Sequence, residues 1–167
     1  EKIVSSLTKG NCHIRDDAVE KLLADAIASN NFQITSDSES VVDCSIYLIC
    51  VPTPVDANNE PDLEPLESAC RIVAPCLKKN DLVVVESTVF PGTCEQVVSP
   101  LLEEISGLNP ADEFYLAHCP ERVNPGDAFW TSENIPRVVG AISDTGVNLA
   151  AEFYASILGG TILDVRE

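Results

Sequence analysis

Hydroxyl and carboxylate side chains follow directly after three apolar runs of the sequence. They are Thr53 after residues 45–52, Ser87 and Thr88 at the end of residues 81–88, and Glu121 after residues 114–119. A carboxylate at the mouth of a sheet is well placed to act as a general base, and hydroxyls there can contact a ligand. The sequence therefore predicts one polar site built from three strand ends.

Each of these residues also has a purely structural interpretation. Thr53 can simply begin a turn, and the hydroxyls of Ser87 and Thr88 can satisfy backbone groups of their loop. Glu121 can form a surface ion pair with Arg122. The residue types alone leave both interpretations open.

A thiol nucleophile is an alternative chemistry, because His118 and Cys119 are adjacent. Neighbours in a strand point to opposite faces, so the two are not expected to form a thiolate–imidazolium pair. A thiol hydrolase would show rapid iodoacetamide labelling of Cys119 with a depressed pKa. The seven cysteines include no Cys-x-x-Cys pair, so we expect no metal site, and their odd number fits a reducing compartment.

The elements that must position these residues alternate between strand and helix patterns. Strand-like runs occupy residues 45–52, 81–88, 114–119, 137–142 and 161–165, and helical spacing occupies residues 17–29, 64–79, 93–106 and 144–158. Pro100, inside the third helix, predicts a kink. Apolar strands separated by amphipathic helices predict a doubly wound, Rossmann-like α/β fold, a parallel sheet covered on both faces. Such sheets bind ligands outside the carboxyl ends of their strands.

Composition narrows the set of partners. With 167 residues the chain fits a single domain, and its formal net charge of −17 argues against binding nucleic acid or an anionic membrane surface. No apolar run reaches the length of a membrane span. One expected motif is missing, because no Gly-x-Gly-x-x-Gly turn occurs among the eight glycines.

Three ordered strings resemble one enzyme family. They are CVPTP at 50–54, ESTVFPGT at 86–93 and CPERVNPGD at 119–127. They are similar to motifs of the nucleotide-sugar 6-dehydrogenases, the UDP-glucose/GDP-mannose dehydrogenase family. The sequence around Pro120 and Glu121 looks closest to that of the branch acting on UDP-N-acetylated sugars. The resemblance therefore makes UDP-N-acetylmannosamine the expected substrate.

The resemblance implies a two-step oxidation of the sugar C6 alcohol to a carboxylate, with two NAD and an enzyme-bound thioester. It also implies a cytoplasmic, homo-oligomeric enzyme of polysaccharide biosynthesis. The site residues that it implies fall into three groups. They are Val51, Pro52, Thr53, Ser87 and Thr88 for the cofactor, Glu121 and Thr88 for catalysis, and Glu121, Arg122, Val123 and Asn124 for the UDP-sugar substrate.

The chain also departs from the family pattern. The first strand, the Gly-rich turn and the second strand of the family are not recognisable, and neither are its thioester-forming cysteine and catalytic lysine. Residues 1–167 are therefore expected to be part of an NAD-binding domain, without the central and C-terminal domains and inactive in isolation. The alternative is a non-catalytic α/β interaction module derived from the same family.

Overall fold

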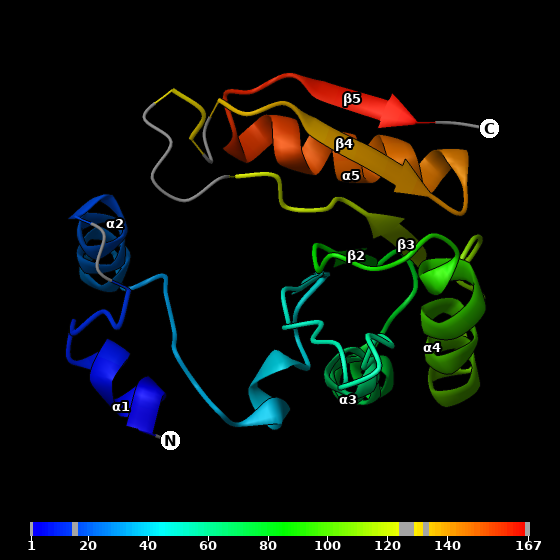
Figure 1. Ribbon diagram of the computed structural model, residues 1–167, viewed down its shortest axis with the longest axis horizontal. Helices are drawn as coiled ribbons and strands as arrows, with labels where there is room; N and C mark the ends of the chain where they lie inside the picture. The colour runs from blue at the N-terminus through cyan, green and yellow to red at the C-terminus, as the bar shows by residue number, and fades with distance from the viewer. Residues whose placement is uncertain (1, 15–16, 124–128, 132–133, 166–167) are drawn as a thin grey trace. The chain divides into compact units, whose positions relative to one another are not determined.

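The computed structural model describes residues 2–14, 17–123, 129–131 and 134–165. It divides into two compact units, residues 1–42 and residues 43–167. The first unit contains helix α1 (Lys2–Thr8), helix α2 (Asp17–Ala28) and a 3-10 turn at Ser38–Val41 (Figure 1). Helix α2 was predicted within one residue, whereas the short α1 was not predicted.

The second unit contains a five-stranded sheet in the order β1-β2-β3-β4-β5. Its strands are β1 (Ile46–Ile49), β2 (Leu82–Val85), β3 (Tyr115–His118), β4 (Arg137–Ala141) and β5 (Ile162–Val165). Each lies inside one of the predicted runs, and the predicted α/β fold class is confirmed. All four residues of β2 are buried, as expected for a strand covered on both faces.

The sheet is not parallel throughout, and here the sequence-based expectation needs correction. β1, β2 and β3 are mutually parallel and β4 is parallel to β5, but β4 runs antiparallel to β3. No helix of the described residues connects β3 to β4, so the chain returns along the sheet without the crossover that parallel pairing requires. As a result, β4 begins at the edge where β3 ends (Figure 1).

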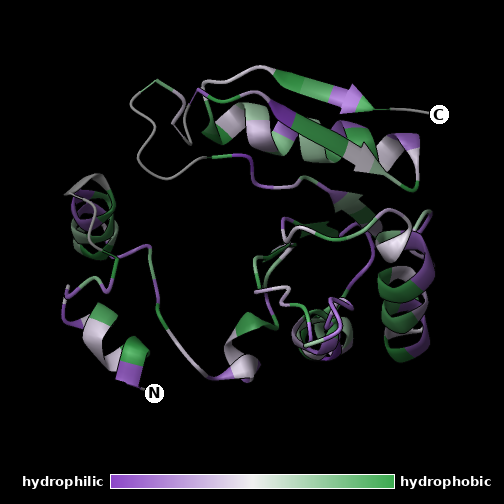
Figure 2. Cartoon of the chain, in the orientation of Figure 1, coloured by the Kyte–Doolittle hydropathy of each residue, from purple (hydrophilic) through white to green (hydrophobic). Residues whose placement is uncertain are grey.

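Helix α5 (Asp144–Ile157) covers one face of the sheet. The Ser143 side chain caps it by accepting a hydrogen bond from the Gly146 N–H. Its Ala150 and Tyr154 pack in one cluster with β2, β3 and β4. Figure 2 shows β4 starting on a hydrophilic segment and continuing as a hydrophobic one, although the hydrophilic first residue, Arg137, is itself buried.

The opposite face carries helices α3 (Glu64–Val73) and α4 (Ser99–Ser106), with α3 against β1. Two prolines reshape the predicted helices, because proline lacks the N–H that a helix interior needs. The helical run that begins at Glu64 turns into a 3-10 segment at Ala74, next to Pro75. The helix predicted from Thr93 is divided into a π-helical segment, Cys94–Val98, and α4, which has Pro100 in its first turn. No helix among the described residues has the length and apolar character needed to span a membrane.

Candidate functional site

The ends of β1 and β2 are joined through the hydroxyl of Ser87. This side chain is buried, and its Oγ accepts a hydrogen bond from the Val51 N–H at 2.9 Å and donates one to the Val51 carbonyl at 2.8 Å. A hydroxyl has a single hydrogen to donate, so Ser87 Oγ has none left for a ligand. The hydroxyl of Ser87 thus holds the backbone that leads into the exposed Pro52.

Thr53 and Thr88 are joined by a direct hydrogen bond. Thr53 Oγ1 donates to the Thr88 carbonyl at 2.7 Å. This bond joins the loop after β1 to the loop after β2 at a second point, next to the link between Ser87 and Val51. Thr88 itself is exposed, and its hydroxyl makes no hydrogen bond within the described residues. The link leaves the Thr88 hydroxyl available to a ligand at the carboxyl edge of the sheet.

The carboxylate of Glu121 is held by three donors. Oε1 accepts the N–H groups of Arg122 and Val123 at 2.6 and 2.7 Å, and Oε2 lies 2.9 Å from NH2 of Arg137. The Glu121 N–H also donates to the carbonyl of Glu86, just beyond the last residue pair of the β2–β3 ladder. A carboxylate has about four acceptor positions, so one on Oε2 remains for a proton or a water molecule.

The ion-pair partner of Glu121 is Arg137, not the adjacent Arg122 that sequence reasoning offered. Arg122 instead directs NH1 to the Pro136 carbonyl at 3.4 Å. The side chain of Arg137 is only 5% exposed, against 42% for Glu121. Its guanidinium carbon lies 5.7 Å from the centre of the Tyr154 ring, within the range of a cation–π contact. Its Nε and NH1 are buried and make no hydrogen bond to the described residues.

A second carboxylate, Glu86, lies at the end of β2. Tyr154 donates its hydroxyl to Oε1 at 2.5 Å, and Cys50 donates its thiol to Oε2 at 3.6 Å. Cys50 is exposed, but partial desolvation of its thiol, followed by the charge of Glu86, raises its pKa to about 11. Burial and the hydrogen bond to Glu86 also raise the pKa of Tyr154. Both groups therefore stay protonated near neutral pH and remain donors to Glu86.

The thiol-nucleophile alternative does not agree with the structure. Cys119 is fully buried, and burial raises its pKa rather than lowering it. His118 lies in strand β3 one residue before it, and its Nε2 is 3.3 Å from the Ser87 carbonyl. Cys119 belongs to the cluster under α5, whereas His118 lines a cavity against the loop at residues 89–95. The two side chains face opposite sides of the strand, as the alternation of strand residues requires.

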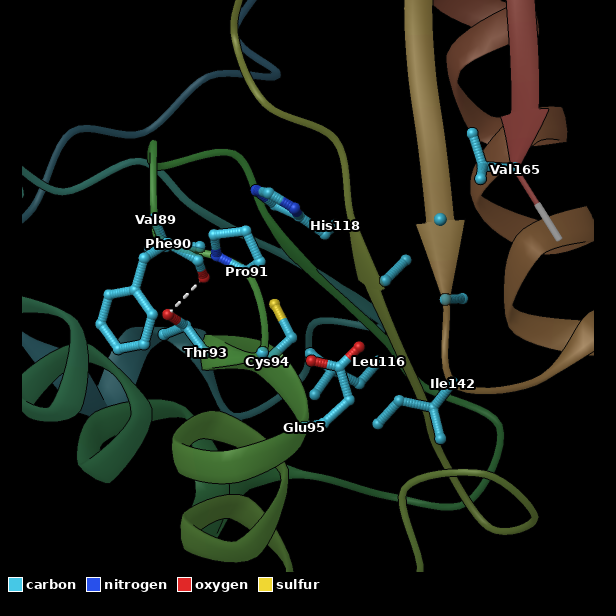
Figure 3. Close-up of a pocket in the computed structure, with 14 residues that line it drawn as sticks. Val89, Phe90, Pro91, Thr93, Cys94, Glu95, Leu116, His118, Ile142 and Val165 are labelled. Carbon is cyan, nitrogen blue, oxygen red and sulfur yellow. Dashed lines mark hydrogen bonds between the residues drawn. The ribbon is translucent and has the colours of Figure 1, made fainter. Parts of the chain in front are cut away.

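That cavity measures about 440 Å³ and is shown in Figure 3. The loop at residues 89–95 forms one wall, and Leu116, residues 140–142 and Val165 complete the lining. In Figure 3, the Thr93 hydroxyl is bonded to the Phe90 carbonyl, a contact of 2.7 Å that shapes the loop. The cavity adjoins the strand end that carries Thr88, but the lining includes none of the residues predicted for the site.

The structure thus brings the predicted residues together at two separate contacts between chain segments, and these residues do not line the cavity described above. Residues 51–53 meet Ser87 and Thr88, and Glu121 meets the backbone of Glu86. Arg122 and Val123 contribute backbone N–H groups to Glu121. Asn124, predicted to contact substrate, lies outside the described residues.

Sequence reasoning missed Glu86, Arg137 and Tyr154 as members of this site. The clearest available signal was Arg137, because a charge at the first position of a buried apolar strand needs an opposite charge nearby. Glu86 is the first residue of the motif ESTVFPGT at 86–93, but the sequence predicts no role for its carboxylate. Tyr154 lies within the helical run 144–158, whose pattern gives no sign of a contact with Glu86.

Comparison with known proteins identifies the family of this chain. Residues 1–158 match the family model described as the NAD binding domain of the UDP-glucose/GDP-mannose dehydrogenase family. The UDP-N-acetyl-D-mannosamine dehydrogenase of Pyrococcus horikoshii is 34% identical over 96% of this chain and 38% of its own length. The UDP-N-acetyl-D-glucosamine 6-dehydrogenase of Salmonella typhi is 37% identical over 75% of this chain and 30% of its own length.

The solved structures give the same result. The structure of UDP-D-ManNAc dehydrogenase from Pyrococcus horikoshii superposes with a TM-score of 0.93 at 33% identity, covering 99% of this chain and 39% of that one. The chain therefore spans well under half the length of the relatives that it matches.

Proposed function

Because the chain belongs to the UDP-glucose/GDP-mannose dehydrogenase family, we propose that it is part of the NAD-binding domain of a longer enzyme that oxidises a UDP-N-acetylated hexosamine at C6. UDP-N-acetylmannosamine is the substrate that we favour. The support is a relative of that name with 34% identity over nearly the whole chain. UDP-N-acetylglucosamine is the second candidate, since a relative named for it is 37% identical over a shorter region.

The proposed reaction converts the alcohol to a carboxylate in two oxidations. The substrate gives up two hydride equivalents to two NAD⁺, and one water supplies the second oxygen of the carboxylate. Between the oxidation and hydrolysis steps the sugar is held as a thioester on a cysteine that lies beyond the 167 residues. We further propose a cytoplasmic, homo-oligomeric enzyme that serves polysaccharide biosynthesis.

The residues present fit one end of a bound NAD. The exposed Thr88 hydroxyl and the backbone of residues 51–53, fixed by Ser87, lie at the carboxyl ends of parallel strands, where such sheets bind nucleotides. When bound, NAD supplies the hydride acceptor. The sequence holds no Gly-x-Gly-x-x-Gly turn to bind a pyrophosphate, so we assign that contact to another segment of the enzyme.

Glu121 is the proposed base in the hydrolytic step. Its free Oε2 position accepts a proton from water as the water oxygen bonds to the thioester carbonyl carbon. The carbon–sulfur bond then breaks and the sulfur leaves as a thiolate. The observation that supports this role is that three donors contact the Glu121 carboxylate. They hold both of its oxygens and leave one acceptor position on Oε2.

A substrate panel tests the proposed function. The complete enzyme that contains this chain is incubated with NAD⁺ and UDP-N-acetylmannosamine, UDP-N-acetylglucosamine, UDP-glucose or GDP-mannose, and NADH formation is followed by absorbance. We expect two NADH per molecule of UDP-N-acetylmannosamine and a lower kcat/KM for the other sugars. Absence of NADH with every sugar would instead support the non-catalytic interaction module.

A further inference from the structure

We infer that Arg137 is a positioning residue that orients the Glu121 carboxylate, and that Tyr154 holds Arg137 in place. The inference rests on the proposed function, because orientation matters only if Glu121 acts on a bound water. Neither residue is expected to touch the substrate, since both are almost fully buried.

Arg137 and Glu121 lie just beyond the paired part of the β3–β4 ladder. Ala117 pairs with Ala141 and His118 with Gly140, and the pairing ends there, because β3 ends at His118. Arg137 is the first residue of β4 and Glu121 follows the end of β3, so the antiparallel direction of β4 brings both to the same edge of the sheet. The 2.9 Å contact between NH2 and Oε2 joins the two across this edge.

The guanidinium is held on a second side by Tyr154. It lies over the Tyr154 ring, and Tyr154 is anchored to Glu86 through its hydroxyl. Glu86 in turn is fixed at the end of β2, whose backbone carbonyl accepts the Glu121 N–H. The contacts thus link Glu121, Arg137, Tyr154 and Glu86 in a ring. Arg137 and Tyr154 are its buried members, whereas Glu86 is partly exposed and the side chain of Glu121 is 42% exposed.

The pattern of satisfied and unsatisfied donors favours this role over a stabilising one. A buried guanidinium with Nε and NH1 unpaired in the described residues is a poor source of stability, and an apolar side chain of similar size often stabilises as well or better. The ion pair that Arg137 makes within the described residues is directed at the proposed base. We therefore expect the Arg137 side chain to contribute more to the orientation of the Glu121 carboxylate than to the stability of the fold.

Two sets of measurements test the inference. In the complete enzyme, Arg137→Met should lower kcat by about 10- to 100-fold while KM for the UDP-sugar changes less than about twofold. Arg137→Lys should recover part of the loss, and Tyr154→Phe, which keeps the ring but loses the hydroxyl bond, should show a smaller decrease. Arg71→Met is the matched control, because Arg71 forms an exposed pair with Glu67 on α3 and should leave kcat unchanged.

The second set needs no activity. In the 167-residue chain, the amide protons of Arg122 and Val123 report on the grip on Oε1. Arg137→Met should shift both amide resonances upfield, Arg137→Lys should shift them less, and the urea midpoint should stay close to that of the unmodified chain. Unchanged amide shifts and unchanged kcat in Arg137→Met would overturn the inference, as would an equal loss in Arg71→Met. If the unmodified enzyme forms no NADH, the proposed function fails, and the amide shifts still decide whether Arg137 orients Glu121.

Discussion

Arg137 lies 2.9 Å from one carboxylate oxygen of Glu121, just beyond the paired part of the β3–β4 ladder, because β4 runs antiparallel to β3 and begins where β3 ends. In a wholly parallel sheet the first residue of β4 would lie at the amino edge, one strand length away from Glu121. The reversal of this single strand therefore supplies the buried cation of the candidate site. It also explains why an arginine can begin an otherwise apolar strand.

The pair should be energetically asymmetric. Glu121→Ala leaves the buried Arg137 without a counter-charge, and because Glu121 is partly exposed we expect a loss of about 2 kcal/mol in the free energy of unfolding. Arg137→Met removes a buried charge with two nitrogens, Nε and NH1, that are unpaired within the described residues, and should change stability by less than about 1 kcal/mol. Urea unfolding of the two variants measures both values, and equal destabilisation would contradict the argument.

The positions of the strand ends could be predicted from the sequence, but the side chains that contact them, above all Arg137, could not. Ser87, Thr88 and Glu121 follow apolar runs, and the rule that ligands gather at carboxyl ends was enough to single them out. Arg137 could not be paired with Glu121 in the same way, because apolar runs carry no information on strand direction. That direction depends on the connection after Glu121, in which the sequence shows turns but no crossover helix.

Cys50 should react slowly with alkylating reagents, and the substitution Glu86→Gln should increase the rate. Although Cys50 is exposed, its pKa is raised to about 11, first by partial desolvation of the thiol and then by Glu86, so the reactive thiolate is scarce near pH 8 and increases as the pH approaches 11. Glu86→Gln removes the negative charge but not the desolvation, so the pKa should fall part of the way towards 9.0 and alkylation should accelerate. Iodoacetamide labelling followed by peptide mass spectrometry measures the rate at Cys50. A rate that is the same in both proteins across this pH range would show that Glu86 does not influence the thiol.

Ser87→Ala should loosen the loop at residues 51–53. The substitution leaves the Val51 N–H and carbonyl without their side-chain partner, which costs about 1–3 kcal/mol where these groups are partly buried. In the complete enzyme we expect KM for NAD⁺ to rise more than KM for the UDP-sugar. Ser156→Ala is the control, because the Ser156 hydroxyl bonds only to the Phe153 carbonyl on exposed α5 surface. Equal effects of the two substitutions on KM for NAD⁺ would argue against a role of Ser87 in the cofactor loop.

The 167-residue chain alone should bind NAD weakly or not at all, and it should oxidise no nucleotide sugar. The reason is that the sequence offers strand ends and one free hydroxyl but no Gly-rich turn for the pyrophosphate. Calorimetric titration of NAD⁺ into the chain checks this expectation. A micromolar Kd would mean that the strand ends suffice to bind the cofactor.

The role of Glu121 as the base of the hydrolytic step is tested most directly by trapping the thioester. The complete enzyme and its Glu121→Gln variant are mixed with NAD⁺ and UDP-N-acetylmannosamine, quenched within one turnover and analysed by intact-protein mass spectrometry. Glu104→Gln, an exposed change on α4, serves as the control. Accumulation of the covalent sugar adduct in Glu121→Gln, but not in the control or the unmodified enzyme, is the predicted result. Slow turnover of Glu121→Gln without any adduct would contradict the assignment of Glu121 as that base.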